Sequence, residues 1–170
     1  TMSSTRTMGI NVTDVHIALS STDATSGPQL PLGFEYHEPA DGTNDYGERV
    51  WVYVEAGEAL AEGEVCMRAA STTTSKVIKT TGAIAALRVL GVAQHTIAST
   101  SFGFILKRGM GEIAVVDTGA DQDDDPLATA ADGRVDVMAG GEEHCVVAHA
   151  TENAAGTAGA LLTAWINCPG

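Results

Sequence analysis

The sequence predicts an all-β fold, a small β-barrel or β-sandwich preceded by an extended N-terminal arm. Short apolar and β-branched runs recur at fairly even intervals from residue 49 onward, with glycine at the turns between them. No segment shows a long helical period with capping residues at its ends. The first 48 residues are instead broken repeatedly by turn-forming residues. We therefore expect an arm over residues 1–48 and a β-domain over residues 49–170.

The arm is expected to hold at most one short strand, over residues 11–19. Beyond it, Pro28, Pro31 and Pro39 interrupt any regular structure. We interpret this region as long enough to reach a neighbouring protein. A loop region folded back on its own domain is the alternative.

The strands of the β-domain follow in order. Residues 50–54 combine β-branched and aromatic side chains, which is a strong strand signal. Residues 59–63 form a turn into a second strand at 64–68, and residues 71–75 read as a loop. Asp132-Gly133 predicts a hairpin turn between two later strands. The remaining strands are expected at 87–95, 101–107, 112–116, 127–131, 135–138, 143–150 and 161–167, with possible helical turns at 81–87 and 154–162.

Two stretches of the domain resemble each other. Residues 89–106 and 146–162 each contain an apolar strand, a loop of small residues and a second apolar run. The likeness fits an internal duplication, and it also fits two unrelated β-hairpins.

Charge and cysteine content restrict the partners. The chain has 9 basic and 22 acidic residues, a net charge of −13, which repels phosphates and argues against nucleic acid as a partner. This charge suits docking on a basic or mixed protein surface.

No apolar run is long enough to span a membrane, and residues 1–9 lack the apolar stretch of a secretion signal. Cys66, Cys145 and Cys168 match no zinc spacing, and we expect buried thiols in a protein made in a reducing cell.

Five segments occur in an order that resembles a known layout. An aromatic-rich strand comes first, followed by a small-residue turn, a Leu-Gly-Val-Ala strand, an Asp-Gly-Arg turn and a closing apolar hairpin. Small structural proteins of tailed bacteriophages, including capsid decoration (cement) proteins, share this order, and the resemblance covers about residues 49–167. Ala148 stands where the pattern usually has glycine. The segments are Val50 to Val54, Glu58-Ala59-Leu60-Ala61-Glu62-Gly63, Val89-Leu90-Gly91-Val92-Ala93, Leu127-Ala128-Thr129-Ala130-Ala131-Asp132-Gly133-Arg134 and Val146-Val147-Ala148-His149-Ala150.

The resemblance implies a structural virion protein rather than an enzyme. Such a protein decorates and stabilises the outer surface of the capsid through contacts with the major capsid protein and with itself, often as a homotrimer. It implies no catalytic residue, no cofactor and no metal ligand. A head fibre or tail structural component is the alternative within the same class. The arm at residues 1–48 is then expected to add a strand to a capsid subunit.

One motif favours a different class of protein. Residues 114–121, Ala-Val-Val-Asp-Thr-Gly-Ala-Asp, resemble the active-site loop of retroviral-type aspartic proteases, with Asp117 as the catalytic carboxylate. The context departs from that family, because only 53 residues follow Asp117 and Val146-Val147-Ala148 lacks the expected glycine. An acidic turn between strands is the simpler interpretation.

The acidic loop at residues 117–125 also approaches a calcium-binding spacing. Asp121, Asp123, Asp125 and Asp132 fall at positions 1, 3, 5 and 12 of an EF-hand-like loop. Pro126 takes the place of the glycine that such a loop needs, and flanking helices are not expected. A solvated acidic loop is the preferred interpretation.

Other candidate ligands lie too far apart. If His144, Cys145 and His149 share one strand, His144 and Cys145 point to opposite faces, and Cys145 lies about 13 Å from His149. One zinc ion cannot reach across that distance. His16, His37 and His95 are isolated in the sequence and are expected to be ordinary surface or core residues. Trp51 and Trp165 are expected either in the core or as anchors that face a partner.

Overall fold

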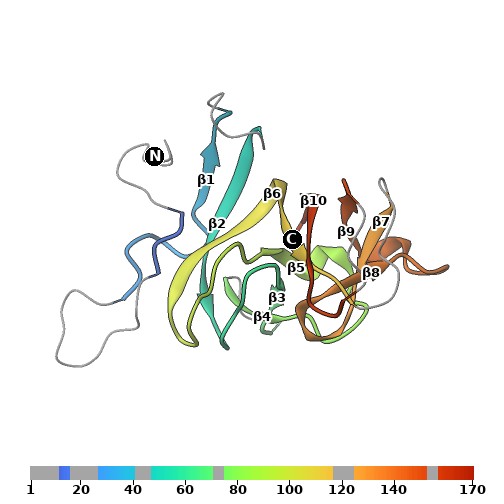
Figure 1. Ribbon diagram of the computed structural model, residues 1–170. Coiled ribbons are helices and arrows are strands. Elements are labelled where there is room, and N and C mark those ends of the chain that lie inside the picture. The colour runs from blue at the N-terminus through green and yellow to red at the C-terminus, as the bar shows by residue number, and fades with distance from the viewer. Residues whose placement is uncertain (1–11, 16–26, 41–46, 71–74, 117–124, 153–156) are drawn as a thin grey trace.

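The computed structural model describes residues 12–15, 27–40, 47–70, 75–116, 125–152 and 157–170. Within these ranges the chain is all-β, which confirms the predicted fold class (Figure 1). Ten strands share one sheet in the order β1-β2-β4-β3-β5-β6-β10-β9-β7-β8. Three 3₁₀ turns, η1 (Ala86–Arg88), η2 (Ala131–Gly133) and η3 (Glu143–Cys145), join some of them. The strands are β1 (Glu35–Glu38), β2 (Arg49–Ala56), β3 (Val65–Arg68), β4 (Lys76–Lys79), β5 (Val89–Val92), β6 (Phe102–Ala114), β7 (Pro126–Thr129), β8 (Val135–Val137), β9 (Val146–Ala150) and β10 (Leu161–Asn167).

Five of the strands close into a barrel. Strand β2 pairs with β4 on one side and with β6 on the other, so that β2, β4, β3, β5 and β6 form a ring. The pairing of β2 with β4 is parallel, while the other strand pairs of the ring are antiparallel. Alternate residues of each strand point inward, as a pleated strand requires. These inward residues fill the barrel, and they are Val52, Val54, Ala56, Cys66, Val77, Leu90 and Ile105, joined by Leu60, Ala93 and Ile97 from the connections.

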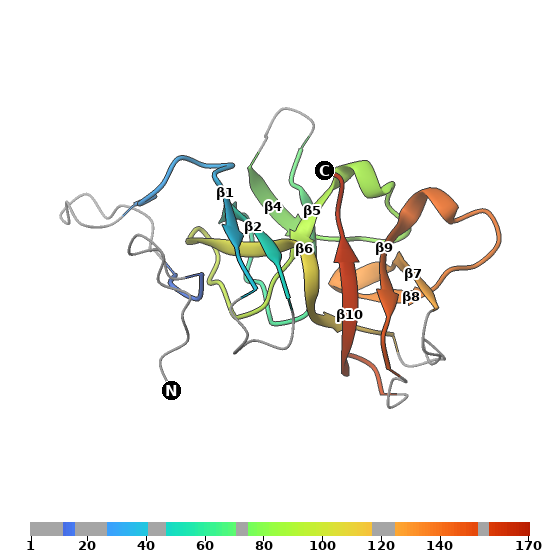
Figure 2. The same ribbon diagram turned by 90° about the horizontal axis from the view of Figure 1, so that it is seen from above.

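A second group of strands extends the sheet beyond the barrel. Strand β6 continues past its barrel partners and pairs with β10, which pairs with β9, followed by β7 and β8 (Figure 1). We call β10, β9, β7 and β8, with the second half of β6, the outer sheet. Seen from above, β10 and β9 lie side by side between the barrel and β7 and β8 (Figure 2). The molecule is therefore a closed barrel from which the outer sheet extends, and the two share strand β6.

Strand β6 corrects the sequence prediction of two strands at 101–107 and 112–116. It is one strand of 13 residues. The intervening Gly109 has a positive φ of 119°, and a Cβ there would lie 2.8 Å from the Glu48 carbonyl oxygen. The glycine thus lets the strand bend where it leaves the barrel, without ending it.

A larger apolar core lies between the outside of the barrel and the outer sheet. Trp51, Tyr53 and Phe104 project from the barrel into it, and the rings of Tyr53 and Phe104 are 5.1 Å apart in a tilted arrangement. Ile113 and Ile166 contribute from the outer sheet. Because β6 supplies side chains to both cores, the barrel and the outer sheet pack as one body.

Part of the expected arm belongs to this body. Strand β1 pairs with β2, with Tyr36 opposite Trp51, and Val12 is 2% exposed in the larger core. The expected division at residue 48 therefore falls between two paired strands. Of the strand expected at 11–19, residues 12–15 are described and form a turn and irregular backbone rather than a strand.

Some of the remaining local predictions are confirmed, and others are corrected. The Asp132-Gly133 turn is confirmed, with φ values of 57° and 71° between the antiparallel strands β7 and β8. A 3₁₀ turn occupies residues 86–88, at the end of one expected helical turn. Strand β4 was not predicted, and the strand expected from residue 143 begins at Val146 because residues 143–145 form the turn η3. Both stretches of the internal likeness contain antiparallel neighbours, β5 with β6 and β9 with β10.

In the part of the chain that the structure describes, we find no helix with the length and apolar character needed to span a membrane.

Candidate interaction surface

Strand β10 divides its side chains cleanly between the core and the surface. Leu162, Ala164 and Ile166 are buried in the larger core. The alternate positions point outward and include Leu161, 42% exposed, and Trp165, 46% exposed. Opposed residues of an antiparallel pair lie on the same side of a sheet, so the outward residues of β6 join them. We call this surface the β6–β10 face, and it consists of Arg108, Met110, Glu112, Leu161, Thr163, Trp165 and Asn167.

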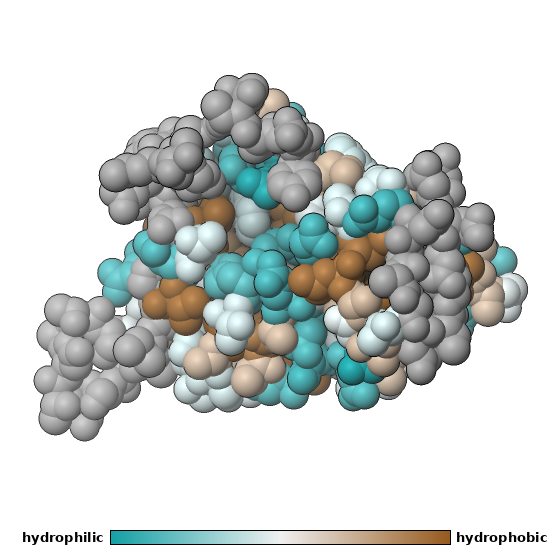
Figure 3. All heavy atoms as spheres, viewed as in Figure 1, coloured by the Kyte–Doolittle hydropathy of each residue, from teal (hydrophilic) through white to brown (hydrophobic). Residues whose placement is uncertain are grey.

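The middle of the β6–β10 face is apolar. Trp165 lies opposite Met110 on β6 and opposite His149 on β9. Pro126 on β7 continues this row beyond His149. The space-filling view shows a hydrophobic patch at the position where Figure 1 places β10 (Figure 3). An exposed indole beside a methionine on a rigid sheet is a typical anchor for a protein partner.

One end of the face is basic and borders a groove of about 290 Å³. Arg108 is exposed there, lies opposite Asn167, and makes no ion pair with any described residue. Lys107 contacts Glu35 with an Nζ–Oε1 distance of 2.7 Å. The groove is lined by Glu35, His37, Val50, Lys107, Arg108, Asn167, Cys168 and Pro169.

The other end of the face is acidic. Burial raises the pKa of Glu112, a hydrogen bond from Thr163 lowers it, and the nearby charges of Glu152 and Glu62 raise it further. Glu152 accepts a 2.8 Å hydrogen bond from the Thr163 backbone N–H, and hydrogen bonds from Thr163 lower the pKa of Glu152. Glu112 and Glu152 therefore both accept hydrogen bonds from Thr163, two residues along β10 from Trp165, and Glu62 adds a third carboxylate near Glu112.

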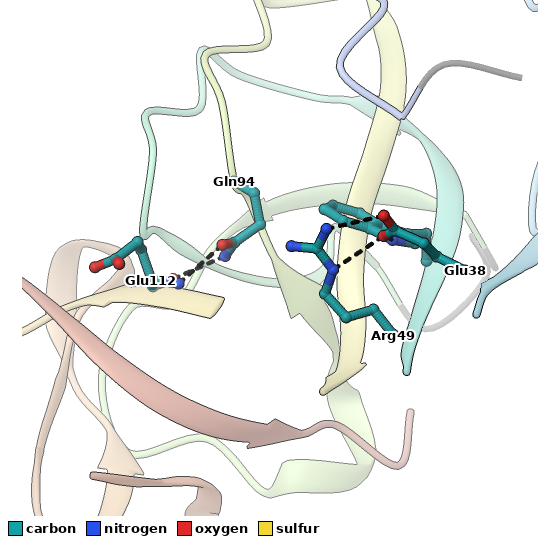
Figure 4. A network of polar contacts seen from close by, with 5 residues as sticks. Glu38, Arg49, Gln94 and Glu112 are labelled. Atoms are coloured by element: carbon teal, nitrogen blue, oxygen red, sulfur yellow. Dashed lines mark hydrogen bonds and ion pairs between the residues drawn. The ribbon is translucent and has the colours of Figure 1, made fainter. Parts of the chain in front are cut away.

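Gln94 holds the second half of β6 in position. Its side-chain amide donates to the Glu112 carbonyl oxygen at 2.7 Å and accepts from the Glu112 N–H at 2.8 Å (Figure 4). This pair of bonds replaces the strand neighbour that β6 loses where it leaves the barrel. A Cβ on Gly111 would lie 2.7 Å from the Gln94 Oε1 atom, so the close approach needs glycine.

A buried ion pair fixes β1 beside the basic end. Glu38 accepts two hydrogen bonds from the Arg49 guanidinium, both 2.9 Å long (Figure 4). It also accepts a 2.8 Å bond from the Trp51 indole N–H, and the Arg49 guanidinium lies 5.2 Å from the Trp51 ring centre. This network sets the position of β1 and hence of His37 in the groove wall.

The predicted calcium and protease residues lie mostly outside the described residues. This holds for Asp117, Asp121 and Asp123, and for Asp124 as well. Asp125 and Asp132 are described, and they lie at opposite ends of the four-residue strand β7. A strand of that length separates its ends by about 13 Å. The second half of the EF-hand-like spacing is therefore a strand and the turn that follows it, with Asp125 and Asp132 at its two ends.

The histidine and cysteine candidates are dispersed. His144 and Cys145 lie in η3 rather than on a strand, which corrects the geometry assumed from the sequence, and His149 points outward beside Trp165. Among the described residues, no three side chains of the metal-binding types gather closely enough to hold an ion.

The prediction of buried thiols is confirmed, since all three cysteines are free and buried. Burial raises the pKa of Cys168 to about 12, so this thiol in the groove wall is unreactive near neutral pH.

Trp51 and Trp165 lie in different environments, whereas the sequence predicted for both either a core position or an outward one. Trp51 is 2% exposed and belongs to the core, whereas Trp165 faces outward. The sequence contained a signal for this difference. Positions 162, 164, 166 and 168 are uniformly apolar or cysteine, whereas positions 163 and 167 hold threonine and asparagine. The polar positions identify the outward side, and Trp165 shares it.

The remaining histidines differ in environment. His37 is exposed near Glu48, and His16 lies outside the described residues. Burial lowers the pKa of His95, opposed by the charge of Asp14. Neither ring nitrogen of His95 has a hydrogen-bond partner among the described residues. Neither His37 nor His95 belongs to the β6–β10 face.

Comparison with known proteins gives a likeness in fold. No protein-family model matches the chain, and no curated protein matches it. Among solved structures, the chain is similar to the N base of the head fibre protein gp8.5 of bacteriophage phi29, with a TM-score of 0.51 and 15% sequence identity. The match covers 70% of this chain and 94% of that one. At this identity the likeness shows a shared fold, and the chain contains nearly the whole fold of that head fibre base.

Proposed function

We propose that this chain is a structural protein of a tailed-phage virion, attached to the outer surface of the head. There it stabilises the capsid through contacts with the major capsid protein. The observation that supports the proposal best is the fold shared with a phage head fibre base, because the order of sequence segments independently resembles that of phage decoration proteins. The β6–β10 face supports it further, since it offers an aromatic anchor and charged groups for contact.

The proposal includes self-association, as a homotrimer, and synthesis in the host cytoplasm before attachment. Many identical copies bound to a lattice spread the internal pressure of the packaged DNA over a large total contact area. A rigid β-body suits this task, because its binding groups are already ordered before contact. The net charge of −13 opposes direct binding to the packaged DNA.

A head fibre base is the second candidate. It is favoured by the fold match, which covers 94% of the phi29 fibre base. A decoration protein occupies many lattice positions and acts by itself, whereas a fibre base carries a further projecting part. Both candidates attach to the head exterior, and the number of copies per particle distinguishes them.

The test is to incubate the purified chain with heads of the phage that encodes it, assembled without this chain, and to image the heads by cryo-electron microscopy. We expect density on the head exterior and greater resistance of the heads to heating. Heads that show no added exterior density after incubation with the chain would contradict the proposal. So would peptide hydrolysis at acid pH that Asp117→Asn abolishes, since that result favours the aspartic protease.

A further inference from the structure

The charges on the β6–β10 face follow an order along the strands. On β6, Arg108, Met110 and Glu112 are alternate residues of one side, about 7 Å apart. Trp165 lies beside Met110 in the middle, and Glu152 and Glu62 reinforce the charge at the Glu112 end. The face is therefore basic at one end, apolar in the middle and acidic at the other.

This order favours one kind of occupant over others. A uniformly basic partner surface would satisfy Glu112 but repel Arg108, and a uniformly acidic one would do the reverse. A second copy, related to the first by the three-fold rotation of the proposed homotrimer, places the acidic end of its face against the basic end of the first copy's face. The apolar middle of each copy then meets the apolar middle of its neighbour. The face is thus complementary to itself in charge.

We propose that copies of this chain bind one another through the β6–β10 face, with Arg108 of one copy against Glu112 of the next and the Trp165 side chains at the centre. The inference deepens the proposed function, on whose self-association it rests, by assigning that contact to particular residues. Trp165 supplies the buried apolar area, and the charged ends fix the orientation in which the copies meet.

Charge reversal tests the proposal with purified protein. We expect the wild-type chain to form an oligomer in sedimentation velocity, and Arg108→Glu and Glu112→Arg each to weaken self-association by about tenfold or more, since like charges then face each other. The double variant Arg108→Glu/Glu112→Arg reverses both ends together and should regain association close to that of the wild type. Arg88→Glu is the matched control, because Arg88 is exposed on η1 outside the face and undergoes the same change of charge.

The rescue separates a contact between copies from a loss of folding, and circular dichroism confirms that each variant is folded. A monomeric wild type overturns the inference, and so does a folded double variant that stays dissociated while Arg88→Glu associates normally. These outcomes are independent of the capsid. A chain that binds phage heads but stays monomeric in solution overturns this inference alone, whereas an oligomer that is absent from virions overturns the proposed function.

Discussion

At the scale of single residues, the Glu38 carboxylate is a buried charge that depends on its hydrogen-bond partners. It is 4% exposed, yet it is matched by the Arg49 guanidinium and the Trp51 indole N–H. A buried charge is tolerated only when it is paired and hydrogen-bonded, because it loses its hydration on folding. The network therefore ties the position of β1 to two residues of β2.

Glu38→Gln keeps the size of the side chain but removes the charge that faces Arg49. We expect the free energy of unfolding to fall by about 3 kcal/mol, the usual cost of removing one partner of a buried ion pair. Glu35→Gln on the same strand is the control, since its pair with Lys107 is more exposed and should contribute less than about 1 kcal/mol. Urea unfolding of both variants checks the difference, and equal losses would contradict this account of Glu38.

Glu112 makes stability depend on pH in a definite direction. Its pKa in the folded chain is raised above the usual 4.5, mainly by burial, so the ionised form destabilises the fold. We expect Glu112→Gln to unfold at higher urea than the wild type at pH 7. The advantage should shrink as pH falls through the raised pKa, and it should vanish below about 4.5, where both states are protonated.

Glu152→Gln is expected to behave in the opposite way, which makes it the control for Glu112. Hydrogen bonds from Thr163 lower the pKa of Glu152 in the folded chain, so its ionised form stabilises the fold above the usual 4.5. That contribution is lost as pH falls through the lowered pKa. Both variants should be measured at dilutions where the chain does not associate. Two pH profiles of the same sign would contradict the assignment.

At the scale of elements, β6 has one set of neighbours in its first part and another in its second part. The strand bends between these two parts. Its first part pairs with β2 in the barrel, and from Arg108 onward it pairs with β10. Gly109 permits the bend, and the Gln94 amide satisfies the Glu112 backbone just beyond it. The orientation of the β6–β10 face relative to the barrel depends on this short segment.

Gln94→Ala removes both hydrogen bonds to the Glu112 backbone. We expect a loss of about 1–3 kcal/mol in the free energy of unfolding, because the backbone groups are half-buried and lose their partner. Amide hydrogen exchange should rise at Glu112 and stay unchanged at Phe104 within the barrel. Uniform loss of protection along β6 would show that Gln94 acts on the whole strand and not on its second half.

At the scale of the whole molecule, the barrel and the outer sheet share both a strand and the larger core. Such sharing predicts that they unfold together. In Trp165→Phe the fluorescence of Trp51 reports on the barrel side of the core, while far-UV circular dichroism reports on all strands. We expect the two urea transitions to coincide. Separate midpoints would mean that the outer sheet unfolds independently of the barrel.

The sequence predicted the fold class and most strands, because the apolar runs and the Asp132-Gly133 turn are local signals. It missed β1, which follows Pro31 and lies beside Pro39, and it missed β4, whose four residues hold only two apolar side chains between Lys76 and Lys79. It divided β6 because Gly109 and Gly111 look like a turn, and only tertiary contacts with Glu48 and Gln94 show that they are not. The β6–β10 face was not predicted as a unit, since pairing of β6 with β10 joins residues about 50 positions apart, from Leu161 with Ala114 to Asn167 with Arg108.

The continuity of β6 has a mechanical consequence. A load on the outer sheet would pass along β6 into the barrel as a pull parallel to the strand, where five residues of β2, 51–55, pair with it in continuous register. Hydrogen bonds that lie across the direction of pull share the load and must break together, whereas bonds opened from one end break one after another. A module built this way resists stretching along one axis more than along others, and the direction in which it is mounted on a shell decides how much strain it withstands.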